Sequence, residues 1–215
     1  MDAKICVSAR QRSADNALTN FTVIKYLNSQ ECRGRPMLEK IFALAREKFK
    51  DELMFEIDEN TLRRNLSPHW FACAAYDTET EEVVSFFTWI VTDTRFRDGL
   101  VSGRMGENDV FAYDGTYPPV LYFNTFVVTN ALHSPYIIRH LIKDLQALVK
   151  ADHLNIVGGL SIGGLRFTEK WLKKYGFHEI GRYKDNYPIL WADRNESAVL
   201  NSLCGRTKAF TPRPW

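Results

Sequence analysis

The segment 120–129, which reads VLYFNTFVVT, limits the possible folds of this 215-residue chain more than any other part of it. Its side chains are apolar on both faces, whereas a strand at a surface alternates between apolar and polar residues. A strand of this kind is buried on both sides, which predicts a sheet covered by helices on both faces. The Ser134-Pro135 pair that follows it predicts the start of a helix with an apolar stripe from Ile137 to Val149.

The other elements follow from hydrophobic periodicity and from turn residues. Strands are predicted at 21–27, 69–76, 83–91 and 154–158, and a last hairpin at 177–183 and 187–192. Helices are predicted from Pro36, over 58–66, and from 165 to the stop at Gly176. Residues 92–119 are expected to be irregular, and 158–164 (GGLSIGG) to form a glycine-rich turn. The order predicts an α/β domain with a mixed, mostly antiparallel central sheet flanked by helices.

Composition narrows the possible functions. The formal net charge is only +2, from 28 basic and 26 acidic residues, so there is no overall field to attract nucleic acid or an acidic membrane. The four cysteines lie far apart and are interpreted as reduced structural thiols, and the five histidines have no metal-ligand spacing, so no metal is predicted. Without a signal peptide or a transmembrane run, a cytoplasmic protein is expected, with no membrane partner.

Two segments resemble the GNAT superfamily of acyl-CoA-dependent N-acyltransferases. Residues 167–177 (FTEKWLKKYGF), followed by HEIG, are similar to the last helix of that family and the strand after it. Residues 120–129 with the capped helix after them are similar to its fourth strand and pyrophosphate-binding helix. The resemblance covers 21–194, which leaves 1–20 as an N-terminal extension and 195–215 as a C-terminal tail.

The resemblance implies an N-acyltransferase that moves an acyl group from acetyl-CoA or another acyl-CoA to an amine on a small molecule or a protein. In that fold the fourth and fifth strands separate, and pantetheine lies between them with its pyrophosphate at the start of the next helix. The residues expected to bind the donor are Phe126, Val127, Val128, His133, Ser134, Tyr136, Ile137, Ile138 and Arg139. Charge is expected from His133 and Arg139, and the ring of Tyr136 is expected where the phosphates would lie.

Three residues are candidates for the chemistry of acyl transfer. Asn124 is the one strongly polar residue inside the central strand, where it could orient the amine or the acyl carbonyl, or else bond to backbone at a strand irregularity. Ser161, in the glycine-rich segment, could bind the thioester sulfur or a phosphate, or be an ordinary loop serine. Tyr175 could protonate the leaving thiolate, or merely pack against the core.

The acceptor is expected beside the acidic loop that contains Glu107, Asp109 and Asp114. Three carboxylates near Tyr113 and Tyr117 would suit a cationic amine, although solvated loop acids are an alternative. The side chains predicted to bind the acceptor are Trp89, Glu107, Asp109, Tyr113 and Tyr122.

Other functions stay open at this point. The segment 130–157 contains no glycine, which would suit a carrier-protein thioester as donor in place of acyl-CoA. The chain could also be a GNAT-fold protein that binds protein or nucleic acid without transferring an acyl group, or a DNA base-modifying enzyme similar to phage Mom. Either a monomer or a homodimer is compatible with the sequence.

Overall fold

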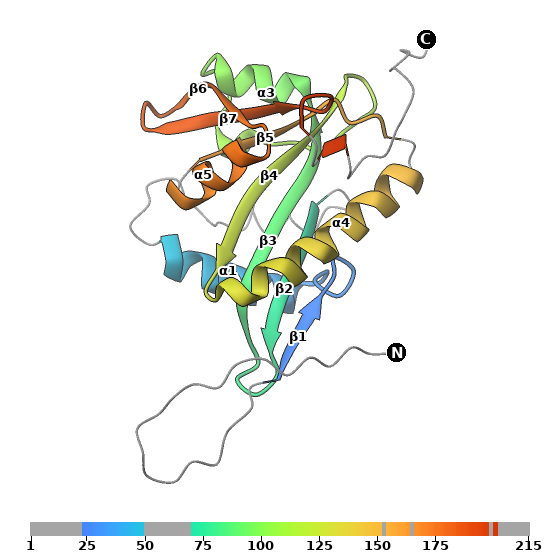
Figure 1. Cartoon of the computed structure of the whole chain (residues 1–215), viewed down its shortest axis with the longest axis vertical. Coiled ribbons are helices and arrows are strands. Elements are labelled where there is room, and N and C mark those ends of the chain that lie inside the picture. The colour runs from blue at the N-terminus through green and yellow to red at the C-terminus, as the bar shows by residue number, and fades with distance from the viewer. Residues whose placement is uncertain (1–22, 50–69, 152–153, 164–165, 198–199, 202–215) are drawn as a thin grey trace.

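A computed structural model describes residues 23–49, 70–151, 154–163, 166–197 and 200–201, which form a seven-stranded sheet with helices on both faces (Figure 1). The strand order is β1-β2-β3-β4-β5-β7-β6. Each neighbouring pair is antiparallel except β4 and β5, which run parallel. The predicted mixed sheet is thus confirmed, and it is mostly antiparallel. The strands are β1 (Ile24–Leu27), β2 (Trp70–Asp77), β3 (Glu82–Asp93), β4 (Pro119–Val128), β5 (Gly158–Ile162), β6 (His178–Tyr183) and β7 (Tyr187–Asp193).

The helices divide between two faces of the sheet, and each face has its own apolar core. One core joins the helices α1 and α3 to the sheet, and we call this side the α1 face. The other core joins α4 and α5 to the sheet, and we call this side the α4 face. The helices are α1 (Arg35–Phe49), α3 (Thr94–Val101), α4 (Ser134–Ala151) and α5 (Arg166–Lys174), with short 3-10 turns η1 (Glu107–Asp109) and η2 (Ala131–His133).

Most of the predicted elements are confirmed with small changes at their ends. Ile137, Leu141 and Leu145 of α4 are buried at successive turns, as the apolar stripe predicts. The helix expected from Pro36 is α1, and the two strands expected after residue 69 pair as the antiparallel hairpin β2–β3. The last hairpin is β6–β7. The helix predicted at 58–66 lies outside the described residues.

The segment 92–119 is not irregular throughout, which corrects the prediction. Its first part is α3, which is capped by Asp93, whose carboxylate accepts the N–H of Arg95 at 2.8 Å. Phe96 and Leu100 of this helix are buried one turn apart on the α1 face. Gly99 lies inside the helix because a larger residue would not fit there. Met105 occupies the space that a Cβ would need, with its sulfur 2.5 Å from that position.

The glycine-rich segment is also not a turn, and the fifth strand starts four residues later than predicted. Residues 158–162 form β5, paired with β4 on one side and β7 on the other. A Cβ on Gly158 would meet the ring of Trp191 at 2.3 Å, and one on Gly159 would meet the ring of Phe177 at 2.9 Å. The glycines therefore make room for aromatic side chains, and phosphate binding does not explain them.

The described chain continues beyond the domain boundary predicted at 194. Ser197 and Leu200 are completely buried, and the backbone N–H of Ser197 donates to Asp193 O. The predicted extension 1–20 lies outside the described residues. Among the described helices, none combines the length and the apolar character needed to cross a membrane.

Candidate functional site

Strands β4 and β5 separate partway along their length. They pair in register from Val120↔Gly158 to Phe123↔Ser161. β4 then continues to Val128, while β5 ends at Ile162, so the described residues provide 124–128 with no partner strand on that side. We call this divergence the fork; in Figure 1 the lower half of β4 extends well beyond β5. The unpaired edge presents backbone N–H and C=O groups that an extended ligand could bind.

A β-bulge lies at the start of the fork. On β3, Thr88 pairs with Thr125 and the next residue, Trp89, pairs with Phe123, so Asn124 is the extra residue. The hydroxyl of Thr88 accepts the N–H of Thr125 at 3.1 Å, which holds the irregular register. Because a bulge bends its strand and increases the local twist, it accounts for the turn of β4 away from β5. Asn124 is half-buried, and its side-chain amide makes no hydrogen bond to another described residue.

Ser161 lies at the apex of the fork. It is buried on β5, and its hydroxyl donates to the carbonyl of Phe123 at 3.1 Å. This hydrogen bond satisfies the last β4 carbonyl before the strands separate. The sequence predicted Ser161 in a turn, near the reacting thioester. In the structure it lies on a strand, within one strand position of Asn124, and its hydroxyl already donates a hydrogen bond to Phe123 O.

The α4 face of the fork is lined by aromatic rings. The ring of Phe87 stacks on Phe123, with centroids 5.6 Å apart, and meets Phe126 edge-on at 5.0 Å. Phe177, which follows α5, meets Phe123 edge-on at 5.8 Å. Phe126 is half-buried, on the part of β4 that has lost its strand partner. We call these four residues the aromatic wall; Phe87, Phe123 and Phe177 are buried in the core, and Phe126 is the half-buried member on the unpaired part of β4.

The start of α4 is held to the sheet by His133, so this residue does not provide the expected positive charge. His133 is buried, and its Nδ1 lies 2.9 Å from the Ser85 hydroxyl of β3. Ser85 Oγ also accepts the N–H of Thr129 at 3.2 Å, which leaves its own O–H free to donate to an unprotonated Nδ1. Burial lowers the pKa of the imidazole, which agrees with a neutral side chain.

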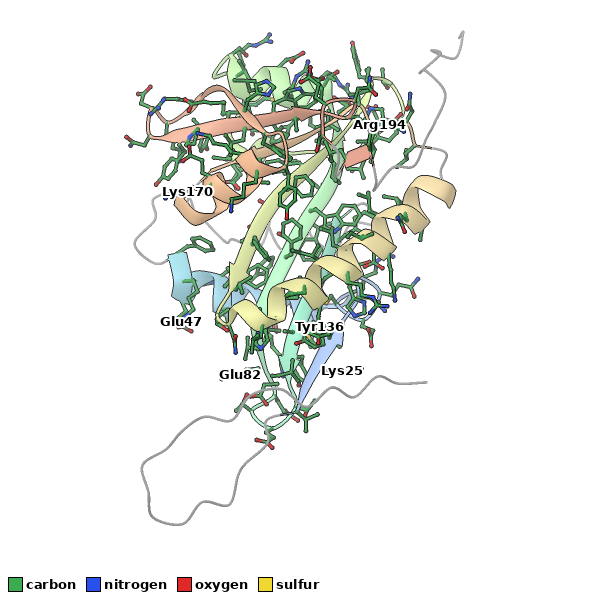
Figure 2. All side chains as sticks on the ribbon, in the orientation of Figure 1. Lys25, Glu47, Glu82, Tyr136, Lys170 and Arg194 are labelled. Carbon is green, nitrogen blue, oxygen red and sulfur yellow. The ribbon has the colours of Figure 1, made fainter. Side chains whose placement is uncertain are left out.

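Tyr136 points away from the fork, contrary to the expected position of its ring among the phosphates. Its ring stacks on Tyr26 of β1, with centroids 4.5 Å apart, and β1 is the strand at the far edge of the sheet from β5. Figure 2 shows the labelled Tyr136 on the β1 side of α4. Of the other predicted donor-binding residues, the side chains of Val127 and Ile137 belong to the two cores, Val128 and Ile138 are half-buried, Arg139 is exposed, and the side chain of Ser134 lies outside the description.

On the α1 face, Tyr122 of β4 meets Glu107 of the loop after α3. The completely buried phenol donates to Glu107 Oε1 at 3.1 Å. The backbone N–H of Glu107 in turn donates to the hydroxyl of Tyr183 on β6, at 3.3 Å. Burial raises the pKa of Tyr122 well above its ordinary value, and the negative charge of Glu107 adds to the rise, so the phenol keeps its proton.

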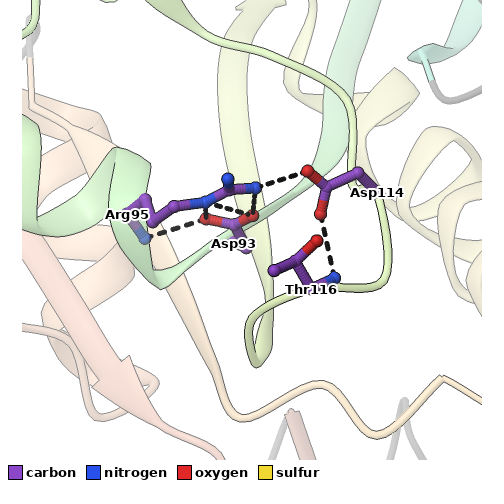
Figure 3. A network of polar contacts seen from close by, with 4 residues as sticks. All are labelled: Asp93, Arg95, Asp114 and Thr116. Carbon is purple, nitrogen blue, oxygen red and sulfur yellow. Dashed lines mark hydrogen bonds and ion pairs between the residues drawn. The ribbon is translucent and has the colours of Figure 1, made fainter. Parts of the chain in front are cut away.

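The other two acids of this loop have structural partners, so the three predicted carboxylates do not form a cluster. Asp109 accepts the N–H of Gly106 at 2.7 Å and caps the 3-10 turn. Asp114 pairs with Arg95 at 2.7 Å, and Arg95 also binds the buried carboxylate of Asp93 (Figure 3). The Arg95 guanidinium, together with the Thr116 N–H, holds the pKa of Asp114 at about 2.

Three more candidates are core residues or lie away from the fork, although Trp89 pairs with Phe123 beside the bulge. Trp89 is completely buried on the α4 face, where it stacks on Phe71, and Tyr113 packs against the same core. Tyr175 follows α5, where its carbonyl accepts the hydroxyl of Ser197 at 2.7 Å. Ser197 bonds to Asp193, which pairs with the first residue of β5, so Tyr175 lies at the opposite end of β5 from the fork.

Sequence reasoning missed four side chains of the site. Phe87 and Phe177 complete the aromatic wall, Thr88 holds the bulge, and Tyr183 supports the loop of Glu107. Each of these residues is distant in sequence from the residue that it contacts. Only the pairing of the strands brings the two together. A polar Thr88 inside the apolar strand β3 was the one visible signal.

The fold resembles solved acyltransferase structures. It matches FeeM, an N-acyl amino acid synthase from uncultured soil microbes, with a TM-score of 0.54 and 11% identity over 83% of this chain and 97% of that one. It also matches Arabidopsis thaliana NAA60 in complex with a bisubstrate analogue, with a TM-score of 0.50 and 14% identity over 81% of this chain and 99% of that one. No protein-family model and no curated protein matches the sequence. The chain therefore has the fold of the GNAT acyltransferases, with a sequence that has diverged far from these two.

Proposed function

We propose that this protein is an N-acyltransferase that moves an acyl group from a thioester donor, an acyl-CoA or an acylated carrier protein, to an amine. The observation that carries the proposal is the fork, because an unpaired strand edge beside a helix start can hold a phosphopantetheine chain. The similarity to an N-acyl amino acid synthase and to a protein solved with a bisubstrate analogue supports the same reaction class.

The residues around the fork suit such a donor. The backbone edge of 124–128 has amide groups for the two amides of pantetheine, which would add to β4 as an extended strand does. The first N–H groups of α4 have no partner within the helix, and the ring of Tyr136 lies away from the fork, stacked on Tyr26. Phe126, the half-buried member of the aromatic wall, offers apolar contact to the acyl chain.

Asn124 is in the best position to contact the reacting carbonyl. A bulge turns the backbone of its residue out of the strand ladder, and the half-buried amide of Asn124 is without a partner in the described chain. A preorganised donor beside a carbonyl stabilises the negative charge that develops when an amine attacks. Ser161, by binding the carbonyl of Phe123, fixes the strand from which Asn124 projects.

The donor half of the proposal is tested by thermal unfolding with acetyl-CoA, decanoyl-CoA and free CoA. A donor at 100 times its dissociation constant stabilises the folded protein by about 2.7 kcal/mol, which raises the melting temperature by several degrees. An acyl phosphopantetheine carrier is tested in the same way. If none of these compounds shifts the melting temperature, the fork does not bind a thioester donor, and the reading as a protein- or nucleic-acid-binding GNAT fold takes its place.

The transfer half is tested with Asn124→Ala. We expect the rate of amide formation to fall about 100-fold, as on loss of one hydrogen bond to a developing oxyanion. The melting temperature should stay within about 1 °C, because the amide has no bond to lose. Asn186→Ala, which removes an exposed amide in the β6–β7 turn, is the control and should change neither. A large loss of stability in Asn124→Ala would make this residue structural.

A further inference from the structure

Glu107 differs from the other acids of its loop in the direction that it faces. Asp109 caps its own turn and Asp114 pairs with Arg95, whereas Glu107 reaches the sheet and accepts a hydrogen bond from Tyr122. Tyr122 is completely buried inside β4. A loop carboxylate therefore lies against the central strand, on the α1 face, where it accepts a hydrogen bond from a completely buried phenol.

The tyrosine that binds this carboxylate lies close to the fork along β4. Tyr122 is two residues from Asn124, which corresponds to about 7 Å along a strand. Tyr183, which accepts the N–H of Glu107, pairs with Tyr187 at the end of the β6–β7 hairpin. β7 passes the end of β5 there, because Ile189 pairs with Ile162 and the N–H of Gly163 donates to Pro188 O. The hydrogen bond from Glu107 N to Tyr183 thus lies toward the fork end of β5, and the one from Tyr122 lies at the level of Leu160, in the middle of β5.

The two faces of β4 also differ in chemistry at this level. The aromatic wall lies on the α4 face, whereas the oxygen atoms of Glu107, Tyr122 and Tyr183 lie on the α1 face. An apolar acyl chain and a cationic amine could therefore approach the same strand from opposite sides. The half-buried Glu107 has the charge sign that attracts an ammonium group.

We propose that Glu107 is the base that binds the acceptor amine and takes its proton, and that Tyr122 and Tyr183 position it. This inference rests on the proposed function. The acceptor class is a primary amine that arrives as its ammonium form.

The proton and bond changes balance as follows. The carboxylate of Glu107 takes one proton from the ammonium group, and the neutral nitrogen attacks the carbonyl carbon of the thioester. The new C–N bond forms and the C–S bond breaks, which leaves a thiolate. The second proton lost by the nitrogen goes to the thiolate, and the proton on Glu107 returns to water. Tyr122 keeps its proton throughout and donates it to Glu107 as a hydrogen bond.

The test compares Glu107→Gln and Tyr122→Phe with the control Asp98→Asn, which alters an exposed acid on α3, on the same face. The acceptors are L-amino acids, spermidine and a peptide with a free N-terminus. Calorimetry measures binding of each amine to the protein with and without CoA. Kinetics measures kcat/KM from pH 5 to pH 10, and thermal shift measures the affinity for the donor.

We expect Glu107→Gln to bind the donor as the unaltered protein does, to lose amine binding at least tenfold, and to lose kcat/KM about 100-fold at pH 7. Its kcat/KM should continue to rise up to pH 10, because only an amine already deprotonated in water can then react. Tyr122→Phe should lose less activity and keep a pH profile of the original shape, while Asp98→Asn should match the unaltered protein.

The outcomes separate the two proposals. If donors bind but Glu107→Gln retains amine binding and kcat/KM within threefold, the assignment of the base is wrong and the proposed function stands. If no donor binds, the proposed function is wrong. In that case calorimetry with the amines alone still decides whether Glu107 binds a cation, and equal affinity in Glu107→Gln would overturn the inference.

Discussion

The two halves of β4 are both rich in apolar residues but have different surroundings. Residues 120–123 have a strand on each side and are all buried, whereas 125–128 pair only with β3 and alternate between buried and half-buried positions. Two phenylalanines, Phe123 and Phe126, lie on either side of the bulge and can be compared directly. The comparison shows that apolar side chains do not by themselves make a closed sheet, since the bulge and the end of β5 decide where pairing stops.

The largest expected effect is a loss of stability when a phenylalanine is replaced by alanine, and it should differ between the two halves of β4. Phe123→Ala should cost about 4 kcal/mol of unfolding free energy, because it empties a buried site between Phe87, Phe177 and Gly159. Phe126→Ala should cost no more than about 2 kcal/mol, because its side chain is only half-buried. Urea denaturation measures both. Equal costs would show that the second half is as tightly packed as the first.

The second half of β4 should also contribute to the binding of the acyl donor, which Phe126→Ala tests. Phe126→Ala should weaken the binding of decanoyl-CoA more than that of acetyl-CoA, because its ring forms the exposed part of the aromatic wall. If the binding of both donors is weakened equally, the aromatic wall does not contact the acyl chain.

A smaller effect is expected at the apex of the fork. Ser161→Ala leaves the Phe123 carbonyl without its hydroxyl donor, at a cost of about 1–2 kcal/mol for an unsatisfied buried acceptor. Ser102→Ala removes a hydroxyl bond to the Asp98 carbonyl on an exposed helix end and should cost less than about 0.5 kcal/mol. If the two variants lose equal stability, the hydrogen bond of Ser161 does not secure the end of the ladder.

The smallest effect is expected at the paired end of β4, where Asp114 binds Arg95 (Figure 3). The folded pKa of Asp114 is about 2, below the ordinary value of an unfolded aspartate, so its carboxylate stabilises the fold above about pH 4. That contribution is lost as the pH falls toward 2. Asp114→Asn should therefore flatten the dependence of stability on pH between 4 and 2, slightly, because the pair is partly exposed. If the stability of Asp114→Asn falls between pH 4 and pH 2 as steeply as that of the unaltered protein, the low pKa of Asp114 is contradicted.

The sequence predicted the elements whose signal is local. The apolar stripe of α4, the strand at 120–129 and the turn of the β6–β7 hairpin depend on residues close together in the chain. The segment 158–164 was misread because glycine normally marks a turn, whereas Gly158 and Gly159 leave room for Trp191 and Phe177. No local pattern reveals a partner of that kind. The start of α3 could have been recognised, since Asp93 is a good N-cap and Phe96 and Leu100 have helical spacing.

The candidate site was predicted less completely than the fold. Asn124 and Ser161 were singled out from residue type, and the structure brings both to the fork. The orientations of His133 and Tyr136 depend on Ser85 and Tyr26, which come from strands that the sequence alone does not place beside α4. Glu107 and Tyr122 were chosen separately, and only the folded loop joins them.

The open edge of β4 has a consequence for handling the protein. Unpaired strand edges promote association between chains, and natural proteins usually cover them. Here the edge lies inside the sheet, where pairing with β5 has ended, so an extended peptide or the terminus of another molecule could enter it as a strand. Purified samples should therefore be less prone to self-association when a compound that lies along residues 124–128 is present, and short β-forming peptides are a starting point for competitive inhibitors.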